Sequence, residues 1–440
     1  MTCHTGGVHD PPDALRLDRS LRRYPLYAGL LNTWFWMPVF FLYFAEHLSL
    51  AEVLRLEAIY YIAVVILEVP SGSFSDRVGR RPTLIISAVS LTAAYALFFV
   101  APELGFAAFV IAQVLLAAGI AFNSGTDVSF HYDALAAVGR ETSFDDREAS
   151  VARICFLSTA GAAIVGGTAA MVNLRAPYAL SALSAIAGLF VVIGFVEPPR
   201  HTPQPDAQAG VNEHAPSFAG QLRACVGDLR HPRLAWLGAV SIGMVVLNHV
   251  PYEFVQPYTQ LLTSDGTRTD PSPLILGVHA TLISLIAAAV AGRSIWVRER
   301  LGLRLTMLSG VMVQTTIIVS MAIVLHPLIL GLVMFRGVSR ALMTAPMNAA
   351  VAPLIPSSRR ATYLSGLSLA GRLSFSGLLL LLSRVAEHGA SDGEMTANTG
   401  ADDAHATWEM LQTILSYSAT VGLIMLAGLL LTGRAMRSSN

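Results

Sequence analysis

Residues 72–81 form a short charged stretch between two long apolar segments, and they read Gly72-Ser73-Phe74-Ser75-Asp76-Arg77-Val78-Gly79-Arg80-Arg81. The flanking apolar segments cover residues 53–73 and 82–101. Gly79 permits a tight reversal of the chain, and Gly72 lets a neighbouring helix approach closely. Asp76 can accept hydrogen bonds from the start of a neighbouring helix or pair with an arginine. The stretch therefore indicates a turn that joins two helices and carries polar contacts.

The composition of the whole chain is that of a membrane protein. Of its 440 residues, 54% are hydrophobic and 13% are charged, against about 25% charged in an average soluble domain. The composition excludes disorder, nucleic-acid binding and nearly every soluble enzyme, and the net charge of zero gives no field that attracts a polyanion. Three distant cysteines show no metal or redox spacing, so a disulfide framework is not implied. We expect no cofactor and no metal.

Twelve apolar runs have the length of membrane-spanning helices, roughly 20 residues each. They cover residues 25–45, 53–73, 82–101, 105–126, 150–172, 177–196, 234–256, 272–293, 304–325, 328–347, 361–383 and 408–432. Runs this long predict helices, because helices satisfy their own backbone groups in lipid. We therefore expect an all-α polytopic membrane protein with twelve transmembrane helices in two six-helix bundles.

Polar, proline-punctuated segments divide the runs into two sets of six. We expect a tail at 1–24, a first bundle at 25–197, a linker at 198–232, a second bundle at 233–433 and a tail at 434–440. Residues 385–407 are also polar and predict a long loop before the last helix. Twenty-one arginines fall on one side of this topology and four on the other, which predicts that both termini and the linker are cytoplasmic.

A second copy of the charged turn supports an internal repeat. Residues 299–304 read Glu299-Arg300-Leu301-Gly302-Leu303-Arg304, which align with residues 76–81 at a constant offset of 223. The acid, the first arginine, the glycine and the final arginine all recur. The two bundles are therefore expected to be pseudo-symmetric.

The stretch at 72–81 resembles the G-x-x-x-D-R-x-G-R-R/K signature of the major facilitator superfamily, the twelve-helix secondary transporters. The resemblance covers the whole chain through its topology. It implies that Gly72, Asp76, Arg77, Gly79, Arg80 and Arg81 form a latch between two helix bundles that stabilises the outward-facing state. The alternative is that the arginines are only topology anchors, which explains neither Asp76 nor the glycines.

Polar and aromatic side chains inside the predicted spans are candidates for the solute and proton pathway, because an ionisable group there costs about 2.5–3.5 kcal/mol. They are Asn32, Trp34, Glu57, Asp127, Arg153, His249, Tyr252, Glu253, Gln256, Arg336, Arg340 and Arg372. Asp127 and His131 lie four apart and share a helix face. We expect Asp127 either to pair with Arg153 or to take part in transport, and His131 to be solvated.

Arg336 and Arg340 also lie four apart, so two guanidinium groups share one face of the predicted helix 328–347. Like charges placed this way repel unless acids or an anionic ligand compensate them. Their expected partner is Glu253 or an acidic group of the substrate, and the alternative is that they only tie helices together. Arg372 adds a third cation to the interior of the same half.

Two features bear on the direction of transport. Aromatic residues at 34, 36, 60 and 61 suit an amphipathic organic substrate. Residues 158–167 are similar to a G-x-x-x-G-P-x-x-G-G motif of antiporters in the family, although Ala162 and Ala163 replace its Gly-Pro pair. Both favour efflux.

The leading hypothesis is a monomeric secondary active transporter of the bacterial inner membrane that exports a small organic compound by alternating access in exchange for protons. The alternative is proton-coupled uptake of a small anionic solute. An alternative of another class is a non-transporting sensor or an enzyme on the same fold. The sequence contains no G-x-x-x-x-G-K-[ST] loop and no lysine, which excludes ATP-driven transport by this chain.

Overall fold

The computed structural model describes residues 11–199, 227–263, 270–291, 293–351, 353–355, 357–393 and 400–435. These residues are mostly helical, and no strand occurs among them. Ten of their helical segments are long and apolar enough to cross a membrane. The all-α membrane fold is thus confirmed. Most of the predicted linker 198–232 and parts of the predicted tails and of the loop 385–407 lie outside the described residues.

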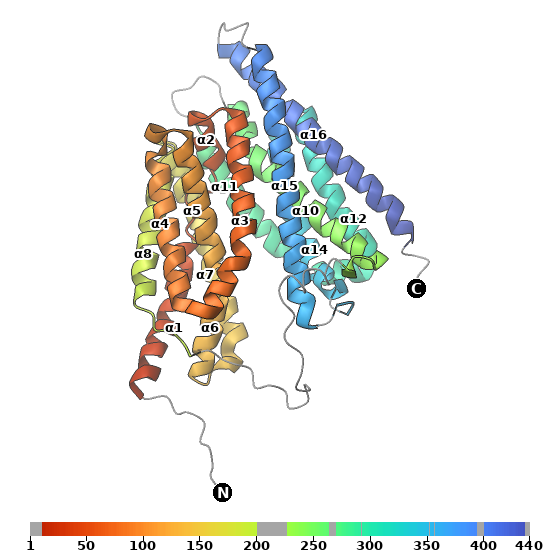
Figure 1. Cartoon of the computed structure of the whole chain (residues 1–440). Coiled ribbons are helices and arrows are strands. Elements are labelled where there is room, and N and C mark those ends of the chain that lie inside the picture. The colour runs from red at the N-terminus through yellow and green to blue at the C-terminus, as the bar shows by residue number, and fades with distance from the viewer. Residues whose placement is uncertain are drawn as a thin grey trace. The chain divides into compact units, whose positions relative to one another are not determined.

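The helices of the first half follow one another along the chain with short connections (Figure 1). They are α1 (Pro11–Leu31), α2 (Phe40–His47), α3 (Leu50–Val78), α4 (Arg80–Leu104), α5 (Phe106–Asn123), α6 (Thr126–Ala137), the 3-10 helix η1 (Glu141–Ser143), α7 (Phe144–Ala170) and α8 (Ala176–Ile193).

The helices of the second half occupy the green to blue part of Figure 1. They are α10 (Pro232–Thr263), α11 (Ser272–Ala291), α12 (Ser294–Ile323), α13 (Pro327–Val333), α14 (Arg336–Val351), α15 (Ser357–Gly393) and α16 (Gly400–Ala435). The polar segment 385–407, expected to be a loop, is helical at both ends because α15 runs to Gly393 and α16 begins at Gly400.

The chain separates into two compact units. One contains Met1–Met37 and Ala63–Gly210, and the other contains Pro38–Ile62 and Val211–Asn440. The segment 38–62, which includes α2 and the first part of α3, therefore packs with the helices of the second half. Its bonds to α10 explain this grouping, since Gln256 Oε1 accepts from the backbone N–H of Phe41 (2.9 Å) and of Leu42 (3.4 Å) near the start of α2.

The predicted span 25–45 is interrupted rather than continuous. Helix α1 ends at Leu31 and α2 begins at Phe40, with Pro38, which has no backbone N–H, in between. Side chains satisfy the carbonyl groups that the break leaves unpaired: Thr159 Oγ1 donates to Asn32 O (2.9 Å) and Trp34 Nε1 donates to Leu31 O (2.8 Å). Breaks at residues 124–125 and 334–335 likewise divide the predicted spans 105–126 and 328–347.

The polar start of α1 packs on its own unit. Leu17 and Leu21 are buried in a cluster with residues of α6. Asp18 accepts hydrogen bonds from Arg22 (2.9 Å) and from Arg140 (2.9 Å), which follows α6. Burial raises the pKa of Asp18, but the hydrogen bonds and charges of the two arginines lower it more, so the pKa lies below its ordinary value.

Candidate functional site

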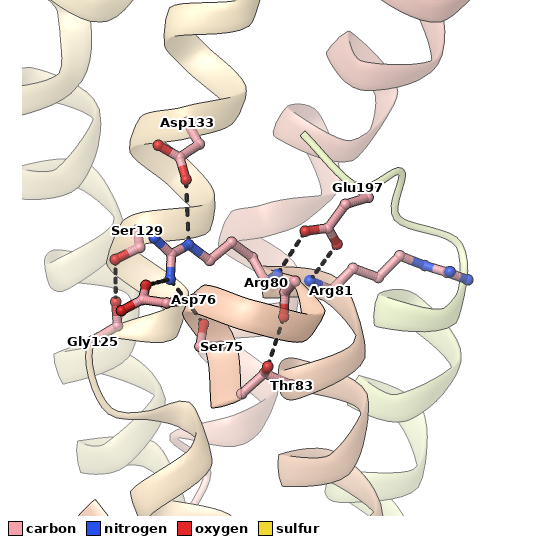
Figure 2. A network of polar contacts seen from close by, with 10 residues as sticks. Ser75, Asp76, Arg80, Arg81, Thr83, Gly125, Ser129, Asp133 and Glu197 are labelled. Carbon is pink, nitrogen blue, oxygen red and sulfur yellow. Dashed lines mark hydrogen bonds and ion pairs between the residues drawn. The ribbon is translucent and has the colours of Figure 1, made fainter. Parts of the chain in front are cut away.

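The Arg80 side chain organises the turn between α3 and α4 (Figure 2). Its Nη1 donates to Asp76 Oδ1 (2.6 Å) and Ser75 Oγ (3.0 Å), and its Nε donates to Asp133 Oδ2 (3.3 Å) of α6. Asp76 is two-thirds exposed, whereas Asp133 is largely buried. Arg80 therefore joins the end of α3 to α6, and Asp76 reaches it from one turn earlier along the chain.

Glu197, a residue not singled out from the sequence, holds the start of α4. Its Oε1 accepts from the backbone N–H of Arg80 (2.6 Å), and its Oε2 accepts from that of Arg81 (2.7 Å). A carboxylate on the unpaired N–H groups at a helix N-terminus is favourable for both charge and hydrogen bonding. The available signal was an acid placed directly before Pro198 and Pro199, at the start of the predicted linker.

The turn requires glycine at position 79 for two reasons. Gly79 has φ 128° and ψ 162°, a conformation essentially restricted to glycine. In addition, a Cβ at this position would lie 2.6 Å from Glu197 Oε1. Gly72 differs, because a Cβ there would have no heavy atom within 4 Å among the described residues. The described residues of the first unit therefore make no close helix approach at Gly72, which is exposed.

The second turn reproduces the backbone of the first. Gly302 has φ 76° and ψ 160°, again in the glycine region. Thr83 Oγ1 donates to Gly79 O (2.6 Å), and Thr306 Oγ1, at the same offset of 223, donates to Gly302 O (2.9 Å). These matching details support the internal repeat.

The final arginines of the two turns also make equivalent bonds. Arg81 Nη2 donates to Ile193 O (2.8 Å) at the end of α8, and Arg304 Nη2 donates to Leu430 O (3.1 Å) near the end of α16. The remaining contacts differ, because Leu303 occupies the position of Arg80 and Glu299 is exposed. Arg300 lies over the Trp296 ring, 5.1 Å from its centroid.

In the first unit, Asp127 does not pair with Arg153. The Asp127 carboxylate accepts from Asn123 Nδ2 (3.1 Å) and from the Val128 backbone N–H (2.8 Å), while Arg153 is exposed. The break before α6 explains this result, because it places Asp127 in the first turn of that helix, where backbone and amide donors are available.

His131 is buried rather than solvated, with 1% of its surface exposed. Its ring stacks on Tyr24 with centroids 4.4 Å apart, and its Nδ1 lies 2.6 Å from Glu148 Oε2. Tyr24 of α1 and Glu148 of α7 cover this position, which the sequence periodicity of α6 alone could not show. The pair connects α6 to α7 within the first unit.

In the second unit, Glu253 is a fully buried acid on α10. Its Oε1 accepts from Tyr61 OH (2.9 Å), and its Oε2 has no hydrogen-bond partner among the described residues. Glu57 and Arg336 both interact with it electrostatically. The structure thus brings together Glu57, Tyr61 and Glu253.

Arg336 makes no ion pair with Glu253, which is one of the two partners expected for it. Its Cζ lies 5.2 Å from the centroid of the Tyr252 ring, and its Nε has no hydrogen-bond partner in the described part of the chain. A cation over an aromatic face is an attractive arrangement that needs no acid. Arg336 is the first residue of α14, which also carries Arg340, so it stands at the start of this helix and not midway along one that covers residues 328–347.

A cavity of about 370 Å³ lies among α10, α14 and α15. Its wall includes Asn248, His249, Arg340 and Arg372, together with three methionines. Arg336 is not part of this wall. The structure therefore groups Arg340 with Arg372 rather than with Arg336, four residues away.

Comparison with known proteins points to one family. The Major Facilitator Superfamily model matches residues 27–377, and no curated protein matches the chain by sequence. The fold is similar to a bacterial homologue of the human lysosomal transporter Spinster in an inward-facing, unoccupied conformation, with a TM-score of 0.71 and 13% identity over 97% of this chain and 98% of that one.

Two further solved structures have the same fold. A mutant of the nucleoside transporter NupG has a TM-score of 0.70 and 13% identity, covering 95% of this chain and 99% of that one. A mutant of the peptide transporter POT has a TM-score of 0.64 and 16% identity, covering 98% and 96%. At these identities the likeness concerns the fold alone.

Proposed function

The chain belongs to the major facilitator superfamily, and we propose that it is a proton-coupled secondary transporter that moves a small organic compound by alternating access. In this proposal, the transporter exports its substrate in exchange for protons. The aromatic residues of the first spans and the glycines retained at 166 and 167 support this direction. A Cβ at Gly166 would overlap the Phe35 carbonyl, so close packing of α7 on the break after α1 depends on it.

One observation carries the proton coupling: Glu253 is buried inside a membrane-spanning helix without an ion pair among the described residues. A carboxylate in that position has lost its hydration and gains little in return, so proton binding there is an efficient way to remove the charge. The hydroxyl of Tyr61 holds one oxygen in place. The other oxygen remains available to a proton.

The charged turn is proposed to set the conformational balance. Asp76 and Arg80 form an ion pair on the surface of the first unit, and Arg80 also reaches Asp133. Such a cluster has alternative partners when neighbouring helices move, which allows it to favour one state of the cycle. The matching backbone of the turn at Gly302 supports a related role in the second half.

A second candidate is proton-coupled uptake of a small anionic solute. It is favoured by Arg340 and Arg372, which both face the cavity of the second unit.

We also propose that the chain works as a monomer in the bacterial inner membrane with both termini in the cytoplasm. The distribution of arginine along the chain supports this orientation.

The test uses purified protein in liposomes and the first solute of a metabolite panel whose flux is sensitive to an uncoupler. For Glu253→Gln, we expect proton-driven accumulation to be lost while solute-for-solute exchange without a gradient continues. The matched control is Glu409→Gln on α16, where the native side chain is 65% exposed, and it should behave like the wild type. Loss of both activities in Glu253→Gln would indicate a structural role, and retention of both would refute the proposal.

A further inference from the structure

The wall of the cavity in the second unit carries a net positive charge. Arg340 and Arg372 reach it from α14 and α15, and the wall contains no aspartate or glutamate among the described residues. The guanidinium of Arg340 forms no ion pair or hydrogen bond with the described part of the chain. A guanidinium that lines a cavity of a membrane protein without a partner from the described chain is available to an anionic ligand.

We propose that this cavity binds an organic anion with a single acidic group on an apolar body, held between Arg340 and Arg372. This inference rests on the proposed proton-coupled secondary transport, of which it favours the second candidate, uptake of a small anionic solute. It deepens that proposal by naming the substrate class. Guanidinium groups on two helices can each donate to the oxygens of a carboxylate, phosphonate or sulfonate.

The orientation of Asn248 adds a third donor. Its Oδ1 accepts from Gln314 Nε2 (2.7 Å), and the same Gln314 nitrogen also donates to Arg336 O (2.7 Å). This bond fixes the Asn248 amide so that its NH₂ group remains as the donor. Asn248 lies on the cavity wall, so its NH₂ group can donate a hydrogen bond to an acceptor atom of the ligand.

The wall also has an apolar, adaptable part, which lies beside the hydroxyl side chains of Ser241, Thr344 and Ser368. Met244, Met343 and Met347 line it from α10 and α14. Methionine has three rotatable bonds and a polarisable sulfur that packs well against aromatic and aliphatic groups of varied shape. The volume of about 370 Å³ lies at the small end of the range for small-molecule sites. A hydrated inorganic anion would leave these methionines unused, so the ligand has a hydrocarbon part.

His249 places a proton acceptor on the same wall. Its Nδ1 donates to Val245 O (2.6 Å), which leaves Nε2 as the nitrogen that can take up a proton. The ring is held edge-on by Tyr61 at 5.2 Å. The titratable and charged groups around it are Tyr61, Tyr252, Arg336, Arg340 and Arg372.

An anion between the arginines and a proton on His249 would stabilise each other, because opposite charges bound side by side attract. Linkage requires that the proton strengthen anion binding by the same factor by which the anion strengthens proton binding. A carrier with this coupling moves the anion and the proton in the same direction. The inference therefore favours uptake by cotransport over exchange.

The test measures binding in detergent without a proton gradient, so its result does not depend on transport. The probes are benzoate, phenylacetate, phenylphosphonate and 4-methylvalerate, each compared with its neutral amide, and the dissociation constants come from calorimetry. We expect acids to bind and amides not to bind. Arg340→Gln and Arg372→Gln should each weaken acid binding by about tenfold or more, as expected for loss of a charge-assisted hydrogen bond.

Arg293→Gln is the matched control, because Arg293 is exposed and bonds to Ala289 O of its own segment. It should bind acids like the wild type. Arg340 is itself exposed, so Arg340→Gln is expected to fold even if Arg372→Gln does not. Binding of the carboxylates should also strengthen as the pH is lowered toward about 5, because the bound anion favours the proton on His249, and His249→Gln should abolish that change.

Equal binding of acids and amides, absence of binding by every acid, or unchanged acid binding in Arg340→Gln would overturn the proposal. Acid binding that is independent of pH in the wild type would overturn the coupling through His249. Selective acid binding by a protein that drives no proton-coupled flux would support the anion site and refute the proposed function. Proton-coupled flux of neutral solutes without acid binding would refute the anion site and support the proposed function.

Discussion

Replacement of Gly79 by alanine tests how the charged turn is built. The backbone conformation of φ 128° and ψ 162° costs an alanine about 1–3 kcal/mol. The new Cβ would also lie 2.6 Å from Glu197 Oε1 and displace a carboxylate that accepts two backbone N–H groups at the start of α4. Loss of that cap costs about 1–2 kcal/mol, since the site is exposed.

Gly302→Ala provides the matched control. Its backbone is equally restricted, with φ 76° and ψ 160°, but a Cβ there meets no heavy atom within 4 Å among the described residues. We expect Gly79→Ala to lower the free energy of unfolding by about 1–2 kcal/mol more than Gly302→Ala. The assay is unfolding of the purified chain by SDS titration from micelles.

A double-mutant cycle isolates the contribution of Glu197. If the alanine at position 79 acts by displacing the carboxylate, Gly79→Ala combined with Glu197→Ala should cost little more than Gly79→Ala alone. Additive costs for the two changes, or equal costs for Gly79→Ala and Gly302→Ala, would refute the reasoning.

Three further predictions address other parts of the chain. Asp76→Asn should leave expression and insertion intact while transport falls by about tenfold or more. Glu299→Gln should reduce transport less, because the Glu299 carboxylate is exposed and lacks the arginine contacts of Asp76. In flux assays, the double mutant should be less than additive if both residues act on one equilibrium. Arg336→Gln should reduce the free energy of unfolding by about 0.5–2 kcal/mol through loss of the contact with Tyr252. Arg336→Lys should recover part of this loss, and unchanged stability in Arg336→Gln would contradict the role of that contact. The pKa of Asp18 is lowered, so its ion pairs stabilise the folded state at pH values above the ordinary pKa of about 3.9. This stabilisation is lost as the pH falls through the lowered pKa, and thermal melts of Asp18→Asn should lack this acid-dependent loss.

The helical fold and the two charged turns follow from local features of the sequence. Apolar runs of about 20 residues have few alternatives to membrane helices, and a glycine within a charged turn marks a position that needs a positive φ. Both Gly79 and Gly302 have that conformation. The breaks were harder to predict, because residues 32–39 are as apolar as a continuous helix and only Pro38 indicates an interruption.

The partners of the charged residues could not be predicted, because they come from distant parts of the chain. Glu197 contacts a turn that lies 117 positions earlier, and Tyr61 reaches Glu253 across 192 positions. Charge alone suggested Glu253 for Arg336, whereas the aromatic face of Tyr252 lies beneath it. Helix spacing paired Arg340 with Arg336, and both lie in α14, but only Arg340 is on the cavity wall, where Arg372 of α15 joins it.

Flux in inverted membrane vesicles shows whether this chain carries out proton-coupled secondary transport. Vesicles with and without the protein are supplied with a metabolite panel, and each flux is measured before and after addition of an uncoupler. We expect at least one solute whose flux requires the protein and collapses with the uncoupler. Equal flux with and without the protein for every solute, or protein-dependent flux that the uncoupler leaves unchanged, would contradict it.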